Sequence, residues 1–84
     1  MPKSTVATVN TTAAIVVTSY IGGQTAYLHS ASGTLYVGNA DLTTANGYKL
    51  DNGDKITIHV GNSEALYAMT SSGTATLYVL TQID

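Results

Sequence analysis

The sequence contains no cysteine, tryptophan, phenylalanine or arginine, and its basic side chains are Lys3, Lys49, Lys55 and two histidines. Without cysteine the chain forms no disulfide, offers no thiolate ligand to a metal and has no thiol nucleophile. Its formal net charge at pH 7 is -2. Because phosphate groups and anionic membrane surfaces are bound by clustered Lys and Arg, the sequence predicts no nucleic-acid partner and no membrane partner.

Charged residues of both signs are scarce, at 10% of the chain against about 25% in an average protein. The polar surface must therefore be built from Thr, Ser, Asn and Gly, which suits close packing against another protein. A chain of 84 residues also buries only about 60–65% of the surface that its unfolded form exposes. With no disulfide to compensate, the sequence predicts association with copies of itself or with a larger partner.

Long apolar runs are also missing. Met1–Asn10 has no continuous apolar stretch, and the strongest run, Ala13–Val17, is too short for a signal-peptide core or a membrane span. We therefore expect the protein to be made in the cytoplasm.

Val, Thr and Tyr are concentrated in short runs separated by Gly, Asn and Ser, which is the composition of β-strands and turns. Strands at a spacing of about eight to twelve residues indicate a sandwich or barrel. We predict an all-β, small single-domain antiparallel β-sandwich of jelly-roll character at 13–84, preceded by an extended N-terminal arm at 1–12. The expected strands are Thr5–Val9, Ala13–Tyr20, Thr25–Ser30, Thr34–Gly38, Gly47–Leu50, Asp54–Val60, Ala65–Thr70 and Thr74–Ile83.

The clearest expected strand is Asp54–Val60, where β-branched residues alternate with polar ones. The step Asn52-Gly53 before it supplies the positive φ angles of a tight turn, which predicts a hairpin with Tyr48–Leu50. The same alternation along the chain predicts the core. Its expected members are Leu35, Val37, Leu50, Ile56, Ile58, Val60, Leu66, Leu77 and Val79.

A weak internal repeat relates 30–37 to 71–79, and the Ser-Gly step in each copy predicts a hairpin. With Ser72-Gly73 as a two-residue loop, small apolar residues of the second hairpin meet on one side, Leu66 opposite Val79 and Ala68 opposite Leu77. A three-residue loop with a bulge at the glycine shifts the pairing by one residue and mixes the faces, so hydrophobic matching favours the two-residue loop.

The other side of this expected hairpin carries the predicted interface. In the favoured register Tyr67 pairs with Tyr78 and Ala65 pairs with Leu80, which makes an apolar stripe on the solvent side. Soluble monomers seldom leave such a stripe bare, and interfaces are enriched in tyrosine. These four residues are therefore the predicted interface of an oligomer of this chain.

No residue constellation points to catalysis. His29 and His59 lie within expected strands with no acid or nucleophile at motif spacing, and we interpret them as surface imidazoles. The run Asp51-Asn52-Gly53-Asp54 faintly resembles a calcium loop, but the later glycine and the distal Glu of such a loop are missing, which favours a turn. The sequence predicts a protein that is not an enzyme, with no catalytic residue, no cofactor and no metal site.

The tyrosines are more informative. Tyr27, Tyr36, Tyr67 and Tyr78 interrupt strands whose other side already carries Leu, Val or Ala, so some of them must lie outside the core. Aromatic rings with a hydroxyl group suit wet protein interfaces and stacking on sugars alike. The alternative is that they cap the ends of a small core.

The order of elements from about Leu28 to Ile83 is set by five stretches, Leu35–Gly38, Leu42–Leu50, Gly53–Ile58, Glu64–Ala68 and Ser71–Leu80. This order resembles that of small capsid decoration, or cement, proteins of tailed bacteriophages. It implies a compact β-sandwich that binds the major capsid protein on the outer surface of an icosahedral head, as a homotrimer, and stabilises the head. A second expectation is another virion role, such as a tail or fibre-tip adhesin that binds host-surface glycans through exposed tyrosines.

Overall fold

The computed structural model describes residues 2–62 and 64–83, and in these ranges it contains β-strands and no helix. No helix in the described part of the chain is therefore long and apolar enough to cross a membrane. The strands lie close to the expected ones. They are β1 (Pro2–Val9), β2 (Ala14–Val17), β3 (Gln24–Ser32), β4 (Leu35–Gly38), β5 (Tyr48–Leu50), β6 (Lys55–Val60), β7 (Leu66–Met69) and β8 (Ala75–Ile83).

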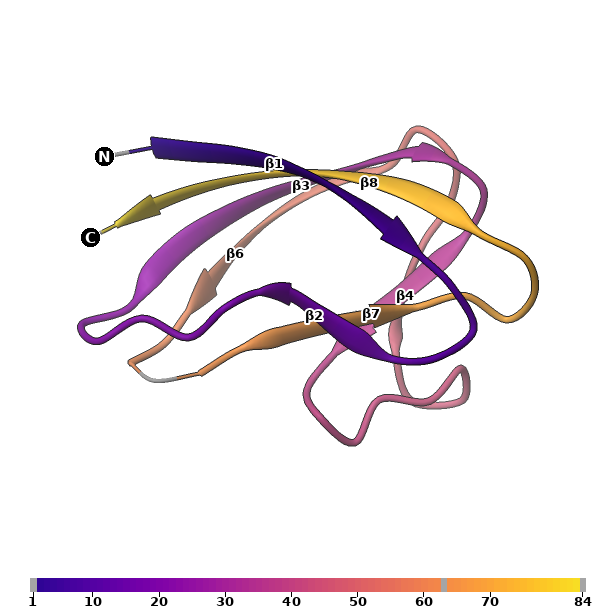
Figure 1. The fold of residues 1–84 in the computed structure, drawn as a ribbon, viewed down its shortest axis with the longest axis horizontal. Helices are drawn as coiled ribbons and strands as arrows, with labels where there is room; N and C mark the ends of the chain where they lie inside the picture. Colours follow the sequence, from indigo (N-terminus) through magenta and orange to yellow (C-terminus); the bar gives the residue numbers. More distant parts are fainter. Residues whose placement is uncertain (1, 63, 84) are drawn as a thin grey trace.

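The strands form two four-stranded antiparallel sheets, with the orders β1-β8-β3-β6 and β2-β7-β4-β5, which pack against each other (Figure 1). The first strand pairs with the last, the second with the seventh, the third with the sixth and the fourth with the fifth. This nesting is that of one long hairpin rolled up on itself, and β3·β8 and β4·β7 pairs complete the sheets. The predicted β-sandwich of jelly-roll character is confirmed.

The alternation of buried and exposed residues along the longest strands, β3 and β8, explains why the two sheets form two layers around one core. In β3 from Gln24 to Ser30 and in β8 from Ala75 to Val79, residues at every second position are buried and their neighbours are half-buried or exposed, which is the pattern of a sheet with one wet side. Leu28, Leu35, Leu50 and Leu77 are among the largest fully buried side chains. Of the predicted core, Ile56 and Ile58 are only half-buried, because β6 is an edge strand whose inward side chains border the open side of the sandwich.

The predicted hairpin of Tyr48–Leu50 with Asp54–Val60 is wrong. The turn itself forms, with Gly53 at φ 89° and the Asp54 N–H donating to the Asp51 carbonyl at 2.9 Å. However, β5 pairs with β4 and β6 pairs with β3. The turn is therefore a corner between the two sheets, because the nine-residue β3 offers β6 a longer apolar partner than the three-residue β5.

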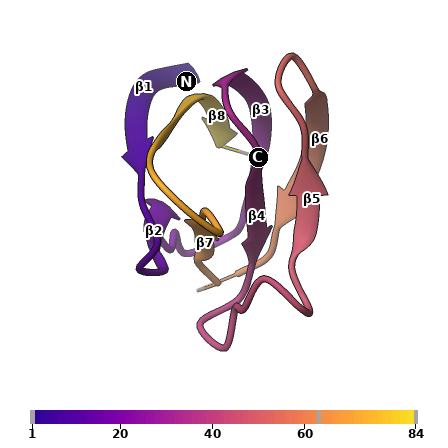
Figure 2. The same ribbon diagram turned by 90° about the vertical axis from the view of Figure 1, so that its right-hand side faces the viewer.

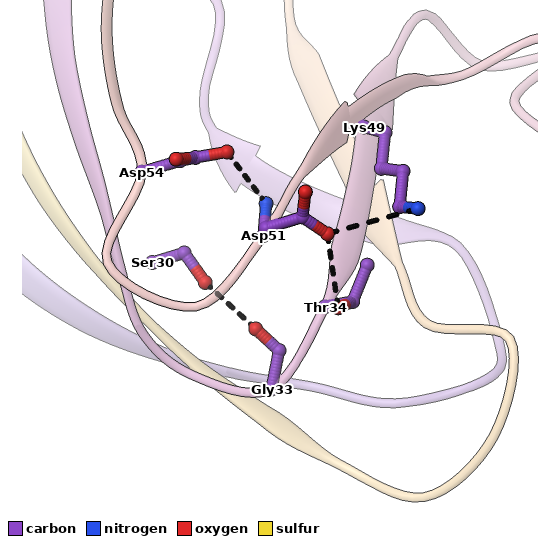
Figure 3. A network of polar contacts seen from close by, with 6 residues as sticks. All are labelled: Ser30, Gly33, Thr34, Lys49, Asp51 and Asp54. Carbon is purple, nitrogen blue, oxygen red and sulfur yellow. Dashed lines mark hydrogen bonds and ion pairs between the residues drawn. The ribbon is translucent and has the colours of Figure 1, made fainter.

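The two hairpins predicted at the Ser-Gly steps are also wrong. The chain passes from one sheet to the other at both places, so β7 does not pair with β8, nor β3 with β4. The two copies of the sequence repeat instead form two similar connections between the sheets. The buried Ser30 hydroxyl donates to the Gly33 carbonyl at 3.1 Å, and the buried Thr70 hydroxyl donates to the Gly73 carbonyl at 2.8 Å (Figure 3 shows the first). Both glycines have positive φ, 73° and 66°, a conformation that glycine adopts without strain.

The predicted N-terminal arm is wrong for the residues that the structure describes. Pro2–Val9 is an edge strand that pairs with β8 along its whole length, from Pro2 opposite Gln82 to Val9 opposite Ala75. Val9 is buried in the core, and the carbonyl of Asn10 accepts a hydrogen bond from the Thr70 N–H. The few large apolar groups of this segment suggested an arm, but one buried valine and a full ladder attach it to the sandwich. Met1 lies outside the described residues.

Candidate functional site

The outward side of the β1-β8-β3-β6 sheet, here called face A, carries large side chains in two neighbouring rows. One row across the sheet is Val6, Tyr78, His29 and Lys55, and the next is Ser4, Leu80, Tyr27 and Thr57. Val6, Tyr78, Tyr27 and Leu80 expose 64%, 47%, 42% and 41% of their surface. Face A therefore presents a contiguous apolar and aromatic patch to solvent, of the kind that marks an interaction surface.

This patch is hollowed into an open groove of about 660 Å³ that is lined by side chains of both rows. The rings of His29 and Tyr78 meet along one wall, with their centroids 6.2 Å apart and their planes tilted by 43°. Ser4 and Thr57 add hydroxyl groups at the two ends of the second row. The groove has the volume of a typical small-molecule site, and it combines apolar walls with a few polar groups as such sites do.

The charges near face A are of one sign. Lys55 and His29 line the groove, and no Asp or Glu is among its described lining residues. His59 lies one row further along the same side of β6. The described carboxylates all lie in connections between strands, at Asp41, Asp51, Asp54 and Glu64. The carboxylate nearest in sequence to Lys55 is that of Asp54, and it accepts a hydrogen bond from the Asp51 N–H at 2.9 Å.

The opposite side of the sandwich, here called face B, is the outward side of the β2-β7-β4-β5 sheet. Ile15 lies opposite Tyr67, and Tyr36 lies opposite both Met69 and Lys49. Ile15 is 49% exposed, whereas Tyr36, Tyr67 and Met69 are half-buried. Face B thus repeats the side-chain types of face A with less exposed surface.

The connection between β4 and β5, which continues from the lower end of β4 in Figure 2, packs against part of face B. Leu42 in this loop is buried although it lies outside the main core, and its Cδ1 would be 3.1 Å from a Cβ on Gly38, which faces outward beside Tyr67. A Cβ on Gly47 would lie 2.7 Å from the Cβ of Tyr36. Only glycine lets the loop return this close to the sheet, so the loop packs over one end of face B.

The structure separates the predicted interface residues. Tyr78 and Leu80 lie together on face A, whereas Tyr67 lies on face B and Ala65 precedes β7 in a connection. The predicted pairs Tyr67–Tyr78 and Ala65–Leu80 are wrong because β7 and β8 belong to different sheets. The expectation that some tyrosines lie outside the core is confirmed, since Tyr27 and Tyr78 are more than 40% exposed. Whether any of these residues forms an interface stays a prediction.

Sequence reasoning did not include Val6 in the patch. In the structure Val9 is buried and Ala7 packs against the core, so the alternation of a strand turns Val6 outward. The sequence alone gives a weak signal, because Val6, Ala7 and Val9 are apolar and lie on both sides of the strand. The position of Val6 beside Tyr78 also required the pairing of the first strand with the last.

The turn that faintly resembled a calcium loop uses its carboxylates within the fold. Asp51 accepts a hydrogen bond from the Thr34 hydroxyl at 3.4 Å and lies 3.7 Å from the Lys49 ammonium, while Asp54 caps the Asp51 N–H (Figure 3). Across the described ranges, no three or more His, Asp or Glu side chains gather closely enough to hold a metal ion. The two carboxylates act here as turn-forming groups.

No protein-family model matches this chain, and no curated protein matches it. Among solved structures, a chain from the appendages of Bacillus endospores, which form disulfide-linked pili, is similar with a TM-score of 0.68 and 16% sequence identity. The likeness covers 96% of this chain and 81% of that one. At this identity the likeness shows that the two chains share a fold, an all-β sandwich of the same overall form.

Proposed function

We propose that this chain is a non-enzymatic structural subunit that decorates the outside of an icosahedral capsid of a tailed bacteriophage. In this role it binds the major capsid protein, forms a homotrimer and stabilises the head. The observation that carries the proposal is the presence of apolar, tyrosine-bearing surfaces on both opposite sides of the sandwich, Val6 and Tyr78 on one and Ile15 and Tyr67 on the other.

A decoration subunit needs one surface that docks on the particle and a further surface that is turned outward or toward a neighbouring copy. The sandwich supplies two such surfaces separated by its core. Tyrosine is enriched at protein interfaces, and exposed apolar patches on small soluble proteins mark contact sites. The low charge of the chain, 10% of its residues, also limits the desolvation that docking requires.

The proposal is tested with capsids that lack the protein. The purified chain should co-sediment with them, and cryo-microscopy should show it as a repeated density on the outer surface. Tyr67→Asp and Tyr78→Asp each place a carboxylate on one face, and at least one of them should abolish occupancy, because an unpaired buried charge is strongly disfavoured. Thr11→Asp, in the exposed β1–β2 connection, is the matched control and should bind normally. Absence of outer density on loaded capsids would refute the capsid role.

A second candidate is a subunit of a pilus-like polymer. It is favoured by the shared fold with a chain from disulfide-linked pili and by the two opposed faces, since head-to-tail contacts between unlike surfaces generate filaments. This chain contains no cysteine, so such a polymer would be held by non-covalent contacts alone. Native mass measurement with negative-stain microscopy separates the candidates: a closed trimer supports the capsid role, and concentration-dependent fibres support the polymer.

A further inference from the structure

The groove on face A has the size of a small-ligand site and is open to solvent. It has a volume of about 660 Å³ and is bordered by Tyr27 and Tyr78, each less than half exposed. Protein sites for small molecules range over about 300–1,000 Å³ and are lined by apolar and aromatic groups with a few polar ones. The backbone beneath the groove belongs to four hydrogen-bonded strands, so the positions from which the wall side chains project are fixed before any ligand arrives.

The chemistry of the walls matches a sugar ring. The face of an aromatic ring is electrostatically negative, and it attracts the weakly positive C–H groups that a pyranose presents on its flatter side. Tyr27 and Tyr78 lie in adjacent rows of face A, on neighbouring strands, and each adds a hydroxyl group. Ser4 and Thr57, at opposite ends of one row, add donors and acceptors that suit the hydroxyl groups of a saccharide.

The positive charge of the groove favours saccharides that carry a carboxylate over neutral ones. Lys55 is its one permanently charged lining residue among those described, His29 lies next to it in the same row, and the lining contains no carboxylate. The Asp54 carboxylate is held by the Asp51 N–H on the adjacent turn. A ligand with a carboxylate therefore gains an ion pair with Lys55 and meets no like charge in the groove.

We propose that the groove on face A binds an oligosaccharide that carries a carboxylate, with the Tyr27 and Tyr78 rings as the platform and Lys55 as the partner of the acid. A second copy that docks through its own face A is a poorer occupant, because the two faces would bring their basic groups together and neither would supply an acid. The site does not depend on capsid attachment and is tested on the isolated protein.

The test is an NMR titration of the ¹⁵N-labelled protein with 3′-sialyllactose, which carries a carboxylate, and with lactose, which does not. We expect saturable amide shifts confined to β1, β8, β3 and β6, with a dissociation constant for the acidic sugar in the millimolar range or tighter. Lys55→Gln should weaken sialyllactose binding about two- to five-fold, as the loss of an exposed ion pair does, and leave lactose binding unchanged. Lys49→Gln, on face B, is the matched control and should alter neither.

Two further variants test the aromatic platform formed by Tyr27 and Tyr78. Tyr27→Ala and Tyr78→Ala should each abolish saturation by both sugars, while unchanged spectra outside face A would show that the fold is intact. Three results would overturn the proposal: no saturable shifts with either sugar, equal affinity for the acidic and the neutral sugar, or shifts that arise with poly-glutamate at lower concentration than with sialyllactose. The last result would assign the groove to an acidic protein partner. None of these results bears on capsid occupancy, so this proposal and the proposed function fail separately.

Discussion

Face A and face B are built from nearly the same side chains, yet face A is open and face B is partly covered. Each face has two tyrosines and one apolar β-branched residue on an edge strand, Val6 on face A and Ile15 on face B. The difference lies in the β4–β5 loop, whose Leu42 is 7% exposed and packs over Gly38. A loop, and not the composition of the sheet, therefore decides which of two similar surfaces is free to bind a partner.

The largest expected effect comes from removing the edge strand of face A. Deleting residues 2–9 removes the whole ladder of β1 with β8 and the burial of Val9, which alone contributes about 1.5–3 kcal/mol. We expect a loss of more than about 3 kcal/mol, a large part of the stability of a small domain. Denaturant melts measure it. As a control, Val6→Thr keeps the strand and changes only an outward side chain, so it should melt almost as the wild type does. If the deletion variant also melts as the wild type does, the segment acts as an N-terminal arm and not as a strand of the sandwich.

A matched pair on one strand separates the core from face A. Leu77 and Leu80 both lie in β8, but Leu77 is fully buried and Leu80 is 41% exposed on face A. Leu77→Ala should lower the free energy of unfolding by about 2–5 kcal/mol, as truncation of a buried leucine does. Leu80→Ala should lower it by less than about 1 kcal/mol, because its side chain stays largely in water. Similar losses in the two variants would mean that face A is covered in solution.

The loop that covers face B is tested at Gly47. A Cβ at this position would lie 2.6 Å from the Leu42 Cδ1 and 2.7 Å from the Tyr36 Cβ. Gly47→Ala should therefore push the loop away from face B and lower stability by about 1–3 kcal/mol, as overpacking does. Thr44→Ala, an exposed neighbour in the same loop, is the control and should leave the melt unchanged. Faster hydrogen exchange at Leu42 in Gly47→Ala alone would locate the effect in the loop.

The sequence predicted the strands well because each strand carries a local signal, either alternation as in β6 or a short run of apolar and aromatic residues between turns as in β2 and β4. It predicted the pairing poorly, because Asn52-Gly53 and Ser72-Gly73 are turns whether the next strand stays in the sheet or crosses to the other. Local hydrophobic matching favoured neighbours such as Leu66 and Val79, whereas the fold pairs strands that are far apart in the chain. The candidate site was predicted least well. Its residues meet only because β1 pairs with β8, β8 with β3 and β3 with β6. Alternation places Ile58 on the core side correctly, but it does not show that β6 is an edge strand, where Ile58 is only half-buried.

The smallest expected effect is a difference in the reactivity of the tyrosine rings, and it tests the comparison of the two faces directly. Tyr27 and Tyr78 on face A are 42% and 47% exposed, whereas Tyr36 and Tyr67 on face B are half-buried. Brief nitration of the free protein, mapped by mass spectrometry, should therefore modify the face A pair a few-fold faster than the face B pair. Tyr48 is 61% exposed and belongs to neither pair of tyrosines. Its rate of nitration serves as the internal reference for a ring that the reagent reaches freely.

The same measurement on protein bound to capsids identifies the docked side. If the groove on face A is turned outward to meet a saccharide, Tyr27 and Tyr78 keep their reactivity on the particle, while Tyr36 and Tyr67 lose what remains of theirs. Protection of Tyr78 on the particle would instead place face A against the capsid, and the groove would then be closed to any ligand in the assembled state. Equal reactivity of the four rings in the free protein would contradict the packing of the β4–β5 loop on face B, because the loop returns to within contact of Tyr36.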